Sequence, residues 1–135
     1  MVKNSEFQFK NPNLKRLEFR VNEDFDVDLY DGLAIDASTI VRRLADGLSA
    51  IVELNIVIGA KDETNPFWID VSMESLFKWQ EGIDEAMREK LISSNAPTLL
   101  LSYIRPIISQ ITSTSRYPRF DLPFLDMTKN DVIER

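Results

Sequence analysis

The sequence predicts an α+β fold, with a four-stranded antiparallel sheet and helices packed on one of its faces. Residues 50–60 and 67–74 alternate apolar and polar side chains, which is the period of a half-buried strand. Near residue 80 the apolar spacing changes to four, at Ile83, Met87 and Leu91, which is a helical period. Because polar residues take every second position of both strands, one face of the sheet should be solvated.

Length and composition are those of one ordinary globular domain. The chain has 135 residues, of which 44% are hydrophobic and 28% are charged, and this is enough to bury a core. We expect a single domain over residues 1–135, with the sheet at about 5–79 and the helical part at about 82–135.

The first strand is expected to be bent or interrupted. Phe7 and Phe9 alternate with polar neighbours, and the alternation resumes at Leu17, Phe19 and Val21. Pro12 lies between the two halves, and proline suits a sheet edge or a bulge because it has no N–H to donate.

A second strand is predicted over residues 25–29, where Asp26 and Asp28 separate apolar side chains. After the turn signal Asp31-Gly32, this strand continues to about Ile35. Residues 36–44 stay open between a strand and a helical turn capped by Asp36. The strands over 50–60 and 67–74 follow, joined by a short loop at 61–66.

Two helices should complete the domain. The first opens near Gly82 with Asp84 and Glu85 at its positive end, and Ser93–Ala96 should end it. Pro97 suits the first turn of the second helix, and Pro106 should kink that helix. An apolar loop over residues 117–125 leads to a short last helix.

The second helix is unusually apolar, since Arg105 is the only formal charge between Pro97 and Ile111. Such a helix should be covered on more than one side, whereas the sheet covers only one. The remaining surface predicts a subunit interface or a binding groove.

Composition argues against several classes of function. The chain has no cysteine and no histidine, so disulfides, thiolate zinc sites and the usual general base at neutral pH are excluded. The spacing of Asp24, Asp26 and Asp28 fails as a calcium loop, because Leu29 and Ile35 stand where glycine and glutamate are required. We expect no metal, no cofactor and no enzymatic activity, with a carboxylate-based hydrolase as a minor alternative.

Location and partners follow from charge and hydropathy. The net charge of −6 disfavours nucleic acid, and no apolar run is long enough to insert into a membrane. The N-terminus lacks the apolar region of a signal peptide, so we expect a cytoplasmic protein. Residues 21–90 carry sixteen acidic and six basic side chains, which is either a solvated face or a docking surface for a basic partner.

The segment Ala96–Arg105 combines Pro97, three apolar residues, Tyr103 and Arg105 at the start of the second helix. It is similar to the Cys-Pro-Asn-(apolar)₃-Pro-Tyr-Ala-Arg helix opening of the bacterial SecB protein-export chaperone family, which the helical part of this chain resembles. Tyr117–Leu122 resembles the family's Phe-Pro-x-Leu-Asn-Leu motif. Phe67–Phe77 matches the family's long fourth strand, so the resemblance extends from about residue 7 to 127.

The resemblance implies an ATP-independent holdase, which keeps client polypeptides unfolded in apolar grooves for protein export. It also implies a homo-oligomer, a dimer of dimers built through the apolar helix and the sheet. The residues expected to form client-binding or subunit surfaces are Trp68, Leu99, Leu100, Tyr103, Tyr117 and Phe120. Trp68 should project from the polar face, either as a partner anchor or under a neighbouring loop or subunit.

Docking to the SecA motor is implied for the family through acidic residues on the first and fourth strands. Asp70 matches the fourth-strand acid, whereas Arg16 and Arg20 fall at or near the first-strand positions and reverse their sign. This reversal should weaken a charge-steered dock. The alternative is an adaptor for one dedicated partner, such as an antitoxin, that acts without SecA.

Overall fold

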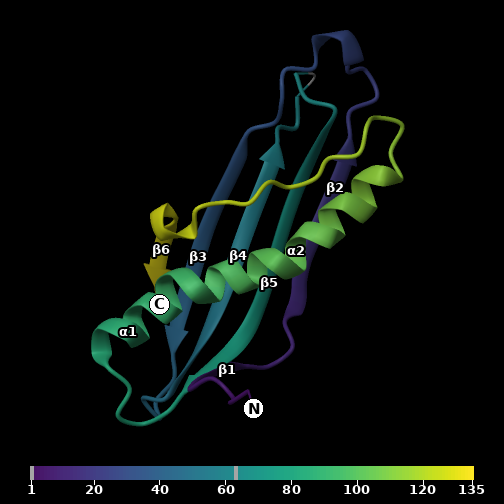
Figure 1. The fold of residues 1–135 in the computed structure, drawn as a ribbon. Helices are drawn as coiled ribbons and strands as arrows, with labels where there is room; N and C mark the ends of the chain where they lie inside the picture. Colours follow the sequence, from purple (N-terminus) through teal and green to yellow (C-terminus); the bar gives the residue numbers. More distant parts are fainter. Residues whose placement is uncertain (1, 63) are drawn as a thin grey trace.

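The computed structural model describes residues 2–62 and 64–135, so Met1 and Glu63, inside the predicted 61–66 loop, lie outside it. Within the described residues, one sheet is crossed on one face by a long helix (Figure 1). The strands are β1 (Phe7–Phe9), β2 (Asn13–Val21), β3 (Ile35–Arg43), β4 (Ser49–Gly59), β5 (Phe67–Trp79) and β6 (Asp131–Glu134). The helical elements are η1 (Val27–Leu29), α1 (Glu85–Lys90), η2 (Leu91–Asn95), α2 (Ala96–Ser113) and η3 (Met127–Lys129).

The α+β class is confirmed, but the described sheet has six strands rather than four. β1 and β2 both pair with β5, so the interrupted first strand is two strands on one edge. Their break at Asn11-Pro12 follows from the missing N–H of proline. The strand order is β1–β5–β4–β3–β6, with β2 beside β5, and β6 runs parallel to β3.

The predicted strand over residues 25–29 is wrong. The Asp26 carboxylate accepts the backbone N–H of Asp28 at 3.0 Å, and this local turn begins the 3₁₀ helix η1. Residues 36–43, which the sequence left open, are the body of β3. The segment between β2 and β3 is therefore a crossover that projects beyond the end of the sheet (Figure 1).

β4 and β5 form the central hairpin, as predicted. They pair antiparallel without a break from Ser49–Lys78 to Gly59–Trp68. Every second residue of β4, from Ala50 to Ile58, is fully buried against the helical layer. The alternation therefore assigns the two faces of the hairpin correctly.

The break predicted at Ser93–Ala96 is wrong, because the helix continues through it. Pro97 has no N–H for the carbonyl of Ser93, and its ring would crowd that carbonyl in a regular α-helix. The backbone widens there into the π-helical turn η2, where the N–H of Ala96 donates to Leu91 O. α1 begins as expected near Asp84, whose carboxylate accepts the N–H of Met87 at 3.1 Å.

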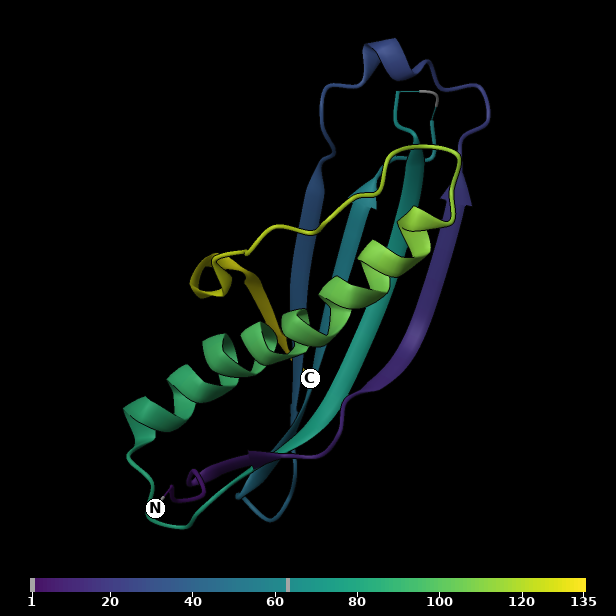
Figure 2. The same ribbon diagram turned by 45° about the vertical axis from the view of Figure 1, so that its right-hand side comes forward.

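α2 and the C-terminal segment cover the same face of the sheet (Figures 1 and 2). The side of α2 toward the sheet is buried and includes Leu100, Leu101, Ile104, Ile108 and Thr112. After α2, residues 117–126 return alongside it, and Arg105 Nε donates to the carbonyl of Leu122 at 2.8 Å.

The expected last helix is a single 3₁₀ turn, η3, and β6 follows it. α2 is continuous through Pro106. The kink expected at this proline stays a prediction. In residues 2–62 and 64–135, no helix has both the length and the hydropathy that crossing a membrane requires.

Candidate functional site

An open apolar hollow lies where the crossover meets the turn after α2. Its volume is about 330 Å³, and we call it the aromatic groove. The residues lining it are Phe25, Val27, Tyr30, Pro66, Tyr117, Pro118 and Arg119.

Two buried rings form the floor of the aromatic groove. Phe25 and Tyr117 are 6% and 5% exposed, and their rings meet edge to face at 5.6 Å. The hydroxyl of Tyr117 donates to the carbonyl of Asn22 at 2.5 Å, which ties the crossover to the chain after α2. Because the floor belongs to the core, the hollow is preformed.

The rim of the groove is apolar and accessible. Val27 and Tyr30 are about half exposed, and the adjacent Leu29 is 72% exposed. Tyr30 also meets Phe25 edge to face at 6.4 Å, so the rim continues the floor. Exposed apolar side chains around a preformed apolar hollow are typical of a surface that binds another polypeptide.

Among the described residues that line the groove, Arg119 carries the charge, and the guanidinium of the neighbouring Arg116 lies 5.2 Å from the centre of the Tyr117 ring. The guanidinium of Arg119 pairs with Asp121 at 3.2 Å. A hydrogen bond from Ser109, and then the nearby arginines, hold the pKa of the Asp121 carboxyl below its usual value. The pair therefore stays charged at neutral pH at the border of the apolar hollow.

A second apolar surface lies on the side of α2 that faces away from the sheet. A hollow of about 440 Å³ there is lined by Leu99 and Phe124 together with Asn95, Thr98 and Ser102. Phe124 is 75% exposed, and its ring is 5.6 Å from the Arg105 guanidinium. Tyr103, which is 39% exposed, meets Phe9 at 6.4 Å. We use the name α2 outer stripe for Leu99, Tyr103 and Phe124 together with Phe9, which lies on the edge strand β1.

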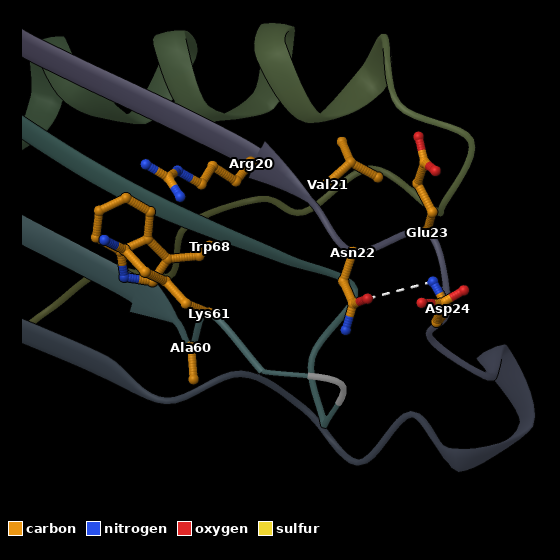
Figure 3. A pocket seen from close by; sticks show the side chains of 8 residues that line it. All are labelled: Arg20, Val21, Asn22, Glu23, Asp24, Ala60, Lys61 and Trp68. Carbon is orange, nitrogen blue, oxygen red and sulfur yellow. Dashed lines mark hydrogen bonds between the residues drawn. The ribbon is translucent and has the colours of Figure 1, made fainter.

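The opposite face of the sheet carries Trp68 at one end (Figure 3). Lys61 Nζ lies 4.2 Å from the centre of the indole ring, and the guanidinium of Arg20 lies at 5.9 Å. These side chains line a hollow of about 360 Å³ with Val21, Asn22, Glu23, Asp24 and Ala60. Trp68 is therefore half-buried between two cations of its own chain.

Asp70 lies on the same face as Trp68 and is engaged within the chain. Its side chain accepts from Arg16 Nη2 at 2.7 Å and from Asn55 Nδ2 at 2.8 Å, and the residue is only 9% exposed. Arg16, which replaces an expected acid, thus neutralises the acid that remains.

Further ion pairs balance the rest of this face. Lys15 lies 2.6 Å from Glu53 and 3.8 Å from Glu74, and Arg42 lies 3.4 Å from Glu74. In its centre the face therefore offers no net acidic surface to a basic partner.

The six apolar residues expected from the sequence do not form one site. Leu100 is fully buried against the sheet, and Tyr117 is the groove floor. Phe120 is half-buried, 6.5 Å from Phe67 in the core. Leu99 and Tyr103 belong to the α2 outer stripe, whereas Trp68 lies on the other side of the sheet.

Sequence reasoning missed the rim residues Val27, Leu29 and Tyr30, because residues 25–29 alternate like a strand. The signal against a strand was Asp26 two residues before Asp28, the spacing of an aspartate-capped turn. In residues 2–62 and 64–135, no three acidic side chains are close enough to hold a metal ion.

The sequence matches a known protein family over most of its length. The family model for preprotein translocase subunit SecB matches residues 9–129. The chain belongs to the SecB family. The match covers every element from β2 to η3, so only β1 and β6 lie at its limits or beyond.

Two curated SecB proteins are similar in sequence. "Protein-export protein SecB" of Alcanivorax borkumensis is 26% identical over 91 residues, which are 65% of this chain and 57% of that protein. "Protein-export protein SecB" of Rhodospirillum centenum is 23% identical over 133 residues, 96% of this chain and 76% of that protein. The first match thus spans little more than half of its relative.

Two solved structures share the fold. A Mycobacterium tuberculosis SecB-like chaperone, in complex with a ChAD peptide from an antitoxin, aligns with a TM-score of 0.67 at 18% identity, covering 88% of this chain and 90% of that one. A Streptococcus agalactiae protein of unknown function aligns at 0.58 and 13% identity, covering 87% and 97%.

Proposed function

We propose that this chain is an ATP-independent holdase chaperone that binds non-native polypeptides in the aromatic groove. The observation that carries this proposal is the groove itself, a preformed hollow with an aromatic floor and an exposed apolar rim. Membership of the SecB family supports it. The proposal includes no catalytic step and no cofactor. The cytoplasmic location of the protein stays a prediction.

Apolar burial suits this task physically. Fully burying one Leu or Phe side chain contributes about 1.5–3 kcal/mol, so a few client side chains suffice for useful affinity. The interaction is non-directional, and therefore one groove accepts many sequences. Client release needs no nucleotide, because each contact is weak and exchanges with competing folded contacts within the client.

The test is suppression of aggregation when a denatured client is diluted without ATP. Val27→Ser with Leu29→Ser removes apolar rim surface at two exposed positions, so the fold should tolerate both changes. Met87→Ser is the matched control, because Met87 is 54% exposed on α1, outside the groove. We expect suppression by the wild type and the control, and a severalfold weaker effect of the double variant. No suppression by the wild type at severalfold excess contradicts the proposal.

The α2 outer stripe is proposed to be a contact between subunits of a homo-oligomer, arranged as a dimer of dimers. Leu99 and Phe124 line a hollow that the chain leaves open, and Tyr103 forms a partly exposed aromatic pair with Phe9. Light scattering should give a multiple of the 15.6 kDa chain mass, and Tyr103→Glu should reduce it. A monomeric wild type contradicts this assignment.

The second candidate is an adaptor for one dedicated partner, with no docking to SecA. The observation that favours it is the Arg16–Asp70 pair, which neutralises the expected docking acid. The antitoxin peptide bound by a chaperone of the same fold supports this candidate. A single stoichiometric partner after co-purification favours the adaptor, and a mixture of clients favours the general holdase. A salt-sensitive complex with SecA restores the export role.

A further inference from the structure

The C-terminal strand β6 covers part of an edge that a longer strand would fit. β6 pairs with Ser38–Val41, which are four of the nine residues of β3. Ile35–Ala37 and Arg42–Arg43 have no register partner in β6. Beside the uncovered start of β3 lies a hollow of about 310 Å³, lined by Asp36, Ala37, Ser38, Asn55, Val57 and Asp131. Unpaired N–H and C=O groups on such an edge are a template for strand addition.

β6 itself is held by little apolar burial. All four of its side chains are exposed, and those of Val132 and Ile133 are 41% and 43% exposed. The pairing is parallel, which is slightly weaker per residue than antiparallel pairing. β6 therefore contributes no side chain to the buried core.

Polar contacts at its C-terminal end fasten β6. Arg43 Nε donates to Glu134 at 2.6 Å, and the same guanidinium holds Glu89 of α1 through two further bonds. The N–H of Arg135 donates to Val41 O at 3.0 Å. In the described part of the chain, the polar side-chain contact made by β6 itself is thus the single ion pair of Glu134 with Arg43, in which the Glu134 side chain is 56% exposed, and exposed ion pairs contribute little to stability.

The segment before β6 is anchored independently. Met127 of η3 is 3% exposed, and Asn130 bonds to Thr39 and to the carbonyl of Met127. η3 therefore keeps its place when β6 departs, and the chain hinges after Asn130.

We propose that β6 is a displaceable self-strand, which covers the β3 edge and yields it to an extended stretch of non-native polypeptide. The incoming segment pairs along Ile35–Arg43, where it gains more backbone bonds than the four residues of β6 make. β6 competes because it is tethered at Asn130, which keeps its local concentration high. This inference rests on the proposed holdase function and adds a second, regulated contact beside the aromatic groove.

The experiment compares the binding of a permanently unfolded polypeptide, reduced and carboxymethylated lactalbumin, to four forms of the chain. These are the wild type, a chain ending at Asn130, and the double variant Ile40→Cys with Ile133→Cys, oxidised and reduced. Ile40 and Ile133 are register partners, and the sequence has no other cysteine, so oxidation locks β6 in place. The oxidised and reduced forms are one sequence and serve as a matched pair if the shortened chain does not fold.

We expect the shortened chain to bind about tenfold or more tightly than the wild type, because the competing strand is gone. The locked form should bind more weakly than its reduced form, which should match the wild type. Equal binding by all four forms overturns the inference and leaves the holdase function standing. No binding by any form overturns both. A rise in the mass of the shortened chain without client also overturns it, because the edge then pairs with a second copy.

Discussion

The side chains on the two faces of β5 are stabilised in different ways, by burial on one face and by ion pairing on the other. At odd positions Ile69, Val71 and Phe77 are buried under the helical layer. At even positions, on the other face, Asp70 and Glu74 are matched by basic side chains from neighbouring strands. One face contributes stability by excluding water. The other face carries acidic and basic side chains that pair with one another. The surfaces proposed to bind clients and subunits lie on the helical side, where apolar surface remains exposed at the crossover and on α2.

The largest difference between the faces should appear on truncating Ile56, which is fully buried in β4. Ile56→Ala should lower the free energy of unfolding by about 2–5 kcal/mol, because it removes buried methyl groups and leaves a cavity. Val57→Ala, one residue along on the other face, should cost less than about 1 kcal/mol. Urea unfolding of both variants measures the contrast, and equal losses contradict the assignment of faces.

Gly59, at the end of β4, should not tolerate a side chain, in contrast to Val57 on the same strand. Gly59 has φ +74°, and a Cβ there would collide with the carbonyl oxygen of Phe67. Gly59→Ala should cost about 2–3 kcal/mol in unfolding free energy. Gly47→Ala is the control, because Gly47 has φ +71° but open space around it. A loss at Gly59 no larger than that at Gly47 refutes the collision.

Within the charged face, the pair at Asp70 should matter more than its neighbours. Arg16→Ala leaves the nearly buried Asp70 carboxylate with Asn55 as its remaining side-chain partner from another strand, and should cost about 1 kcal/mol. Lys15→Ala should change stability by less than about 0.5 kcal/mol, because Lys15 is half exposed. Thermal unfolding of both variants checks the order, and a reversed order is inconsistent with the pairing described.

The smallest expected effect concerns pH. The hydrogen bonds that Arg43 donates to Glu89 lower the pKa of the Glu89 carboxyl below its usual 4.5. The positive charge of Arg43, and the hydrogen bond and charge of Arg88, act in the same direction. A carboxyl with a lowered pKa in the folded state contributes stability above pH 4.5, and loses it as the pH falls through the folded value. As the pH is lowered below 4.5, the thermal unfolding temperature of the wild type should therefore fall more steeply than that of Arg43→Ala. Parallel curves contradict the role of this pair.

The sequence allowed much of the sheet to be predicted, because apolar alternation is a local signal. β4 and β5 were recovered with their buried faces, and the break at Pro12 follows from a missing N–H. The crossover was not recovered, since Asp26 and Asp28 alternate with apolar residues equally well in a strand and in a capped 3₁₀ turn.

Features that depend on contacts between residues far apart in the sequence could not be predicted from local sequence patterns. The π-helical turn before Pro97 keeps α1 and α2 continuous, although Ser93–Ala96 has the composition of a break. The pairing of β6 with β3 joins residues about 90 positions apart, and its four exposed side chains carry no burial signal. The aromatic groove likewise depends on Phe25 meeting Tyr117, a contact that only the folded chain creates.

The most direct test of the holdase account is photo-crosslinking of an unfolded client from the two faces. A photoreactive phenylalanine analogue replaces Tyr30 on the groove rim in one protein and Trp68 on the charged face in another, since both side chains are accessible. We predict crosslinks to unfolded lactalbumin from position 30 and none above background from position 68. Crosslinking from position 68 alone, or from neither position, would contradict the account.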